Sequence, residues 1–418
     1  MKILYLVHQF YPEFWTGTEK VVQKISSMMQ KAGQDVGVIT YSFYEDTQFD
    51  KNIGDMLYRE LSYKGIRVTA LRHRHVPDDI HVALGDTRMR TVAERLLSAA
   101  KPDVIHVGHP MRVGEILLAA KSSNLPYVIT LTDFWLLCPK FILVDSKGDL
   151  CRGPHHGDVC RRSCPELPSD LIKKRLLVAG EILLGARTIV APSAFLAAMF
   201  RNEFGDLNIK VVNHGVSYST IKRNNRTSGN GSMLIFCYAG SLNHHKGAHV
   251  LVEAFKGIRS ENVVLKMFGS GPDPLYVNRL LDLASGDKRI EFCGVFPEEK
   301  VGEILSTVDV VIVPSLWYES YCLVLAEALA CHTPVIVPNV GAMAERVRNG
   351  VNGFTFSLGN SDSLRATMEE VIANPGILDD LKRNSDAFFV PTVEQEAYAY
   401  YKMYAQASPP RAPGNQGM

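Results

Sequence analysis

Two glutamates, Glu319 and Glu327, mark the stretch of this 418-residue sequence in which residue type and spacing point most directly to chemistry. They follow a run of β-branched residues at 310–313, which predicts a buried strand that ends in a loop. A helix is predicted from Ser320, a good N-cap residue, and its apolar residues leave almost no polar face. Glu327 lies in the middle of this helix, where a buried carboxylate needs a protein cation or a ligand to donate hydrogen bonds to it.

The loop between this strand and helix is a candidate ligand site. Ligands of open parallel sheets bind at the carboxyl ends of the strands, and the free N–H groups of a helix N-terminus suit an anion such as a diphosphate. Glu319 precedes the helix and would face the same crevice. A structural pair around a core helix is the simpler explanation of two isolated glutamates, so the neighbouring motifs must decide between the two interpretations.

Glu319 and Glu327, with seven residues between them, resemble the E-x7-E motif of the family-4 retaining glycosyltransferases. Enzymes of that family have the GT-B fold, in which two Rossmann-like domains hold a nucleotide sugar between them. The resemblance implies that Glu327 holds the ribose hydroxyls of the donor and that Glu319 contacts the transferred sugar. The donor-binding residues that it implies in this stretch are Glu319, Tyr321, Cys322, Leu323, Val324 and Glu327.

Other loops in the C-terminal half also resemble donor-binding loops of that family. The stretch from Gly240 to Lys246 looks like the Gly-Arg…Lys-Gly loop that grips the donor diphosphate, and Lys246 matches its lysine. A fixed cation stabilises the charge that a departing diphosphate gains. Ser241 stands where the family commonly has arginine, so His244, His245 or a neighbouring arginine must compensate. The remaining donor-binding residues implied here are Gly269, Gly271, Gly294 and Val295.

The N-terminal half matches the family less closely. Gly17 and Thr18 occupy the place of a Gly-Gly loop that approaches the donor phosphates and acceptor, and only Gly17 matches. Asp133 matches a His-Asp-Phe-Trp-type segment near the reacting sugar, but Thr132 replaces its histidine. His109, at the end of a neighbouring predicted strand, is a candidate to supply the imidazole, and a structural role is the alternative.

Four cysteines gather in the loop at 138–164, which is too rich in glycine and charge to predict a helix. Only the last two have the close spacing that is typical of zinc ligands. A structural zinc site, free thiols and a disulfide all remain open as interpretations. The candidate zinc ligands are Cys138, Cys151, Cys160 and Cys164.

Alternation of predicted strands and helices along the chain indicates parallel sheets with helices on both faces. With the resemblance, it predicts an α/β protein of GT-B fold, with two Rossmann-like doubly wound domains, an interdomain cleft and a C-terminal crossover helix. The expected parts are an acceptor-binding domain at 1–214, a linker at 215–232, a donor-binding domain at 233–391, a helix at 392–405 that crosses back, and a disordered tail at 406–418.

Composition fits a soluble globular protein, with 46% hydrophobic and 21% charged residues. A net charge of +1 gives no indication of nucleic-acid binding. The sequence has neither an apolar run of 18 residues nor an export signal, so a cytoplasmic location is expected. Basic residues at 161–175 flank a leucine-rich helix that either contacts lipid at the inner membrane face or is simply solvated.

Together these observations predict a retaining hexosyltransferase of class EC 2.4 that uses a UDP- or GDP-sugar and requires no cofactor. Its acceptor would be a glycan, lipid-linked or small-molecule hydroxyl in polysaccharide or glycoconjugate biosynthesis. A non-catalytic nucleotide-sugar sensor or scaffold is the alternative, and it is favoured by the residues that differ from the family motifs at positions 18, 132 and 241. A GT-B epimerase or phosphorylase is another, although the full E-x7-E set argues against it. The predicted catalytic residues are Glu319, Lys246, Asp133 and His109.

Overall fold

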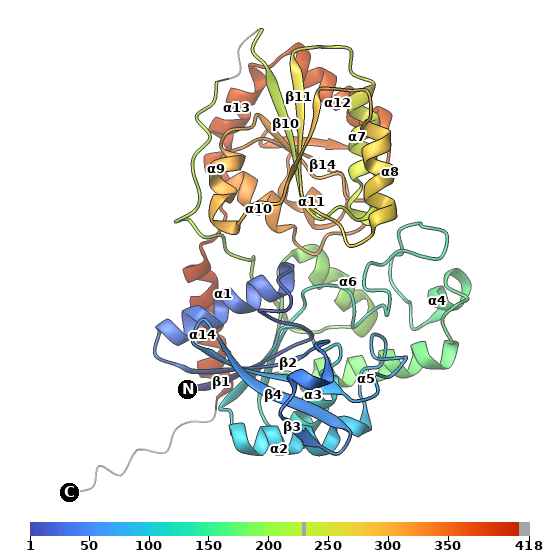
Figure 1. The fold of residues 1–418 in the computed structure, drawn as a ribbon, viewed down its shortest axis with the longest axis vertical. Helices are drawn as coiled ribbons and strands as arrows, with labels where there is room; N and C mark the ends of the chain where they lie inside the picture. The colour runs from blue at the N-terminus through green and yellow to red at the C-terminus, as the bar shows by residue number, and fades with distance from the viewer. Residues whose placement is uncertain (228–230, 409–418) are drawn as a thin grey trace, which may run out of the picture. The chain divides into compact units, whose positions relative to one another are not determined.

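The computed structural model describes residues 1–227 and 231–408, and it consists of two compact α/β units (Figure 1). Unit 1 combines Met1–Val212 with the C-terminal segment Val393–Met418, and unit 2 is Asn213–Thr392. Each unit has one extended sheet with helices on both faces, so the predicted α/β class is confirmed. Within the described ranges, every helix is too short or too polar to cross a membrane.

Unit 1 is built on a nine-stranded sheet in the order β3-β4-β5-β2-β1-β6-β7-β8-β9. The β3–β4 and β4–β5 pairs are antiparallel, and all the other pairs are parallel. The strands are β1 (Lys2–Val7), β2 (Asp35–Tyr41), β3 (Lys51–Ile53), β4 (Met56–Tyr63), β5 (Ile66–His73), β6 (Val104–Val107), β7 (Tyr127–Thr130), β8 (Thr188–Ala191) and β9 (Ile209–Val211). The helices are α1 (Gly17–Lys31), α2 (Arg90–Ala100), α3 (Gly114–Ser122), α4 (Asp158–Ser163), α5 (Ser169–Gly185), α6 (Ala194–Phe204) and α14 (Val393–Ala407).

The C-terminal helix α14 lies beside α1 on one face of the unit 1 sheet (Figure 1). Two of its tyrosines are buried and bonded to polar groups of the central strands. Tyr400 Oη is 2.7 Å from Thr130 Oγ1, and Tyr404 Oη contacts His106 Nδ1. These contacts attach the last helix to the first unit, as the predicted crossover requires.

Unit 2 has a six-stranded, entirely parallel sheet in the order β12-β11-β10-β13-β14-β15. Its strands are β10 (Leu234–Ala239), β11 (Val263–Phe268), β12 (Ile290–Gly294), β13 (Val310–Ile312), β14 (Val335–Pro338) and β15 (Gly353–Phe356). Its helices are α7 (Ala248–Lys256), α8 (Pro274–Ala284), α9 (Val301–Leu305), α10 (Leu323–Ala330), α11 (Gly341–Arg346), α12 (Ser361–Ala373) and α13 (Ile377–Asn384).

Alternating side chains of β10 fill the two cores of unit 2. Phe236 and Tyr238 pack into the core beneath α7, α8 and α12, whereas Cys237 packs into the core beneath α9 and α10. A strand whose two faces are both buried must be apolar throughout, which is why its sequence reads as a continuous hydrophobic run.

Several predicted boundaries were wrong. Helix α10 begins at Leu323 and not at Ser320, and its N-cap is Cys322. Residues 211–216 resemble the family's strand that leads to Asn-Gly-Val, but strand β9 ends at Val211, so most of this stretch is not strand. The hairpin of β3 and β4 was not predicted, and a short helix, α4, lies in the cysteine-rich loop that was expected to have none.

The described part of the predicted linker, 215–227, packs onto unit 2. Asn224 is buried and its Nδ2 donates to Val308 O at 2.7 Å, while Arg226 pairs with Asp309 at 2.9 Å. This segment is therefore fixed to the unit rather than free. Helix α14 extends two residues beyond the predicted end, to Ala407, and the predicted tail from 409 onward lies outside the described residues.

Candidate functional site

The carboxyl ends of the unit 2 strands bring the predicted donor loops to one edge of the sheet. Because all six strands are parallel, the loops that follow β10, β11 and β13 emerge at the same edge. Gly240 and Ser241 follow β10, Gly269 follows β11, and Ser315 follows β13. The fold thus gathers loops that are separate in sequence into a single rim.

Lys246 and Glu319 form an ion pair on this rim, with 2.8 Å between Lys246 Nζ and Glu319 Oε1. The same oxygen accepts hydrogen bonds from Ser315 Oγ at 2.7 Å and from Trp317 Nε1 at 2.9 Å. The Lys246 ammonium also lies over the Trp317 ring, 4.9 Å from its centroid. Lysine is flexible, and these contacts hold its charge in one place.

The electrostatics of the pair follow from its burial. Glu319 is only 6% exposed, and this burial raises its pKa. The charge and hydrogen bond of Lys246, with the hydrogen bonds from Ser315 and Trp317, outweigh burial, so the pKa of Glu319 lies below its usual value. Glu319 is therefore ionised at neutral pH. All three donors use Oε1, which leaves Oε2 for a ligand hydroxyl.

Helix α10 begins immediately after this pair. Its N-cap, Cys322, has a φ of +68°, a left-handed conformation that favours glycine and that a cysteine rarely adopts. The turn exposes the first N–H groups of α10, at Leu323 and Val324, to an anion. Tyr321 is buried behind the turn, and its hydroxyl donates to His214 O at 2.7 Å. Glu327, one turn along α10, is half-buried rather than fully buried as predicted.

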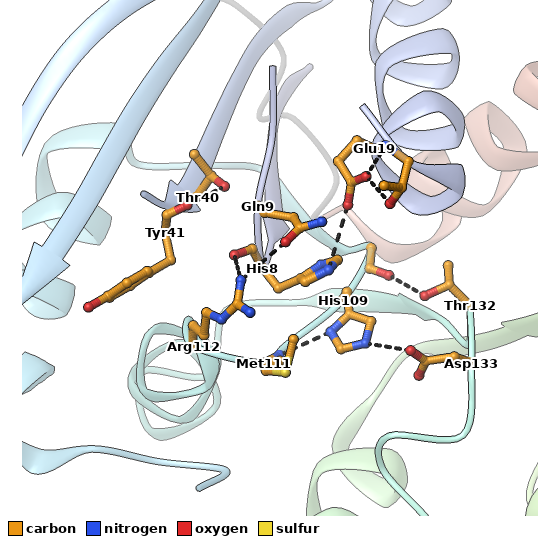
Figure 2. Close-up of polar contacts among 12 residues, drawn as sticks. His8, Gln9, Glu19, Thr40, Tyr41, His109, Met111, Arg112, Thr132 and Asp133 are labelled. Carbon is orange, nitrogen blue, oxygen red and sulfur yellow. Dashed lines mark hydrogen bonds and ion pairs between the residues drawn. The ribbon is translucent and has the colours of Figure 1, made fainter. Parts of the chain in front are cut away.

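Unit 1 has its own group of polar residues at the carboxyl ends of β1, β6 and β7 (Figure 2). His109 follows β6, and its Nε2 is 3.0 Å from Asp133 Oδ2, which follows β7. Met111 N–H donates to His109 Nδ1 at 3.2 Å, so the proton lies on Nε2 and is donated to Asp133. Trp135 N–H donates to the other Asp133 oxygen at 2.8 Å. His109 is buried, whereas the Asp133 side chain is 25% exposed and is the partner a ligand can reach.

His8 and Glu19 lie next to this pair. The His8 and His109 rings are 4.2 Å apart, and His8 Nε2 is 3.6 Å from Glu19 Oε1 (Figure 2). Glu19 is fully buried, with Oε2 accepting from Thr16 N–H and Thr16 Oγ1, and burial raises its pKa. Burial, then the charges of His109 and Arg112, hold the pKa of His8 well below its usual value. Gly17 and Thr18 form the adjoining first turn of α1.

Comparison with known families identifies both halves of the chain. Residues 15–219 match the family model described as Glycosyltransferase Family 4, and residues 221–388 match the model described as Glycosyl transferases group 1. The chain belongs to glycosyltransferase family 4. The predicted family is therefore confirmed, and the matched ranges together include every predicted catalytic and donor-binding residue.

Solved structures place this family-4 chain in the GT-B fold. It resembles Anabaena HepE in complex with UDP and glucose, with a TM-score of 0.68 and 18% identity over 97% of this chain and 99% of that one. It also resembles sucrose-phosphate synthase from Thermosynechococcus elongatus, with a TM-score of 0.71 and 18% identity over 97% and 98%. At this identity the likeness establishes the fold alone, and it confirms the predicted one.

Curated relatives of this family-4 chain share only part of their length with it. It is 26% identical over 211 residues to a lipopolysaccharide 1,2-N-acetylglucosaminetransferase of Salmonella typhimurium, covering 47% of this chain and 52% of that protein. It is 26% identical over 218 residues to a phosphatidyl-myo-inositol mannosyltransferase of Propionibacterium freudenreichii, covering 50% and 54%. The chain spans about half the length of these relatives.

At Ser241, where the family commonly has arginine, His245 does not supply the missing positive charge. Burial, and then the charge of Lys246, lower the pKa of His245 to about 4, so His245 is neutral at pH 7. A better candidate is Arg346 at the end of α11, whose guanidinium lies 4.4 Å from the Tyr321 ring centroid. Its Nη1 is buried and has no hydrogen-bond partner within the described part of the chain.

The fold itself requires glycine at two of the predicted donor-binding positions, Gly269 and Gly271. A Cβ on Gly269, which has a φ of +147°, would lie 1.8 Å from Gly240 O, and one on Gly271 would lie 2.1 Å from Leu242 O. These glycines let the chain approach its own backbone, whether or not they also approach a nucleotide. Gly294 ends β12, and the next residue, Val295, is 71% exposed.

The cysteine-rich loop gives no support to a zinc site. All four cysteines are free thiols, and the described residues include no group of three or more histidine, cysteine or acidic side chains arranged to hold a metal. Burial raises the pKa of Cys138 to about 11 and of Cys160 to about 12, so both are protonated at neutral pH. Cys160 packs with Ile172 and Leu176 of α5 as a small apolar side chain.

Sequence reasoning missed four residues of the two sites, namely His8, Glu19, Arg112 and Arg346. His8 could have been found, because it directly follows the first predicted strand, as His109 follows another. Glu19 lies in a predicted amphipathic helix, where an acidic residue in the first turn usually only complements the helix dipole. Arg112 lies on loop backbone that no periodicity reveals, and Arg346 ends a helix of six residues, which is too short for periodicity to show which face is buried.

Proposed function

We propose that the protein is a retaining glycosyltransferase that moves a sugar from a nucleotide-diphosphate sugar to a hydroxyl acceptor. The observation that carries the proposal is the Lys246–Glu319 pair at the start of α10, with Glu327 farther along the same helix. A site of this kind offers a fixed cation and free N–H groups to a diphosphate and two carboxylates to sugar hydroxyls. Unit 2 would bind the donor, and unit 1 would bind the acceptor.

Each residue would have a distinct role in transfer. Lys246 and the first N–H groups of α10 would stabilise the departing diphosphate, and Arg346 would supply the second cation in place of the arginine absent at 241. Glu327 would accept hydrogen bonds from the ribose hydroxyls, and Oε2 of Glu319 would accept one from the transferred sugar. Gly240, Gly269, Gly271, Gly294 and Val295 would border the nucleotide.

The reaction would proceed on one face of the sugar. The acceptor oxygen bonds to the anomeric carbon as the bond from that carbon to the diphosphate breaks, and the acceptor proton passes to a diphosphate oxygen. Asp133, held by His109, would position the sugar or acceptor hydroxyl. We infer a UDP- or GDP-sugar as donor and a glycan, lipid-linked or small-molecule acceptor in polysaccharide or glycoconjugate synthesis. No cofactor is part of this proposal.

Nucleotide release from UDP-, GDP- and ADP-sugars, followed by chromatography with and without candidate acceptors, tests the activity. We expect acceptor-dependent release from one nucleotide class and a product whose anomeric configuration, measured by proton NMR, matches that of the donor. An inverted product would contradict the retaining mechanism. Binding without turnover would favour a nucleotide-sugar sensor, the second candidate, for which Ser241 in place of arginine is the supporting observation.

We also propose that the protein is cytoplasmic and contacts the membrane peripherally through helix α5. Leu177 is 67% exposed and Leu184 is 75% exposed on one side of this helix, and Lys173 and Lys174 are exposed one turn before Leu177. Exposed leucines beside lysines are typical of helices that lie on anionic lipid. Sedimentation with anionic vesicles, compared with neutral ones, tests this contact.

A further inference from the structure

Arg112 lies between the strand ends of unit 1, at the turn after β6, with a half-buried side chain (Figure 2). Its Nη2 is 3.0 Å from His81 Nδ1, and its Nη1 is 3.2 Å from Gln9 Oε1 and 3.4 Å from His8 O. Burial, and then the charge of Arg112, lower the pKa of His81, so its ring is neutral and accepts. The three acceptors around Arg112 are therefore uncharged at neutral pH.

No carboxylate of the described residues lies within 4.0 Å of the Arg112 nitrogens. Burial lowers the pKa of Arg112 to about 10, which still leaves the group positively charged at pH 7. The carboxylates of Glu19 and Glu13 raise the pKa of Arg112 from beyond ion-pair distance, so this partly buried charge has no direct carboxylate partner. Proteins ordinarily neutralise such a charge with a partner or a ligand.

Arg175 is also buried with no carboxylate at its nitrogens, but its setting differs. It is 3% exposed, donates to the carbonyl oxygens of Val82 and Trp135, and lies 4.5 Å from the Trp135 ring centroid. Those contacts fix α5 to the loops that contain Val82 and Trp135, and they leave Arg175 almost closed to solvent. Arg112 also lies over an aromatic ring, 4.8 Å from the Phe43 centroid, but it is only half-buried and lines a small cavity at the surface.

The acidic residues Asp86 and Glu115 of that cavity have their own cations. Asp86 pairs with Arg88 at 2.8 Å, and Glu115 pairs with Arg90 at 2.5 Å. Their charges are already balanced, so they do not neutralise Arg112. Arg112 therefore has no direct ion-pair partner among the acidic residues of this cavity.

We propose that Arg112 binds an anionic group of the acceptor, a phosphate or a carboxylate, in the loops that also hold His8, His109 and Asp133. A guanidinium is well matched to the paired oxygens of either group. This inference rests on the proposed function, in which unit 1 takes the acceptor. It narrows the acceptor class to molecules that carry a negative charge near the accepting hydroxyl.

Thermal shift of the full chain tests the inference without requiring turnover. The probes are glycerol 3-phosphate and methyl glucuronide, with glycerol and methyl glucoside as their neutral counterparts. We expect one anionic probe to raise Tm by about 2 °C or more, with an effect that weakens in high salt, and the neutral probes to have no effect. A response to glycerol 3-phosphate indicates a phosphate-bearing acceptor, and one to methyl glucuronide indicates an acidic sugar.

Arg112→Gln should raise the probe concentration needed for the same Tm shift by about tenfold or more, and Arg112→Lys should raise it less. Arg72→Gln is the matched control, because Arg72 is also half-buried in this region but already pairs with Asp46 at 3.0 Å. An equal response to charged and neutral probes, or an unchanged response in folded Arg112→Gln, would overturn the inference. Arg112→Gln should still bind nucleotide, because the proposed nucleotide site lies in unit 2. If the unaltered protein binds no nucleotide at all, that result counts against the proposed function and not against the role of Arg112.

Discussion

The two sites of this protein treat charge in opposite ways. In unit 2 the cation Lys246 and the carboxylate Glu319 neutralise each other at 2.8 Å, and Ser315 and Trp317 complete the arrangement. In unit 1 the cation Arg112 has only neutral acceptors, and Glu19 is buried with one oxygen lacking a hydrogen bond.

This difference indicates how each site would meet its ligand. In the proposed donor site a diphosphate would share Lys246 with a carboxylate that already holds it in position, so that site would be preorganised before binding. In unit 1 the cation Arg112 has no direct carboxylate partner, so an anionic ligand would complete the electrostatics of the proposed acceptor site. Acceptors vary more between related enzymes than donors do, which agrees with placing the variable chemistry in unit 1.

Breaking the Lys246–Glu319 pair should give the largest effect. Lys246→Ala leaves a buried carboxylate without its cation, so we expect a loss of about 3 kcal/mol in unfolding free energy and at least about 100-fold in kcat. Chemical denaturation and steady-state kinetics measure the two quantities.

The double variant Lys246→Met/Glu319→Leu separates these effects. Removing both charges should restore most of the stability but none of the activity, because an apolar pair can replace a buried ion pair in packing but not in chemistry. Full activity in either variant would show that the pair is structural.

Arg346 tests whether unit 2 supplies a second cation to the diphosphate. Arg346→Gln should weaken binding of the nucleoside diphosphate about ten- to 100-fold by calorimetry, the effect of losing one charged hydrogen bond. Arg348→Gln is the control, since Arg348 lies over the Phe388 ring in the same segment and should bind normally. Equal affinities for the two variants would leave Lys246 as the single cation of the site.

Glu19 tests the charge imbalance of unit 1 through pH. Burial raises the Glu19 pKa above its usual 4.5, so the folded protein keeps this proton where the unfolded chain has lost it. The resulting stability is complete below pH 4.5 and is lost as pH rises through the folded-state pKa. Glu19→Gln, which keeps an acceptor for Thr16, should therefore exceed the unaltered protein in Tm at pH 7 by about 2 °C and match it near pH 4.

The exposed Glu94 provides the control for that experiment. Glu94→Gln should change Tm by the same small amount at both pH values, because its carboxylate is solvated in the folded protein. A Glu19→Gln variant that is less stable than the unaltered protein at pH 7 would show that the ionised carboxylate is well compensated.

The sequence predicted the fold well because the fold depends on local signals. Apolar runs in the sequence predict strands at 2–7, 104–107, 188–191, 234–239 and 263–268, and these are the bounds of β1, β6, β8, β10 and β11. The E-x7-E spacing drew attention to the stretch that contains Glu319 and Glu327. The start of α10 was missed because Ser320 is a good cap by type, whereas the backbone turns at Cys322 with a positive φ. The hairpin of β3 and β4 was missed because its polar, half-exposed residues have no clear alternation.

The acceptor side could not be predicted in the same way. Arg112 faces His8, more than 100 positions away, and its backbone adopts a φ of +66°. The Ser241 departure was visible in sequence, but the neutral state of His245 follows from burial among residues of two separate loops. Long-range packing decides such features.

Nucleotide binding by matched glutamate variants tests the donor site most directly. Thermal shift against UDP-, GDP- and ADP-sugars would be measured for the unaltered protein, for Glu327→Ala and for Glu303→Ala, an exposed glutamate of α9 in the same unit. The account predicts that one nucleotide class stabilises the unaltered protein and Glu303→Ala but not Glu327→Ala. No shift with any nucleotide, or an equal shift in Glu327→Ala, would contradict it.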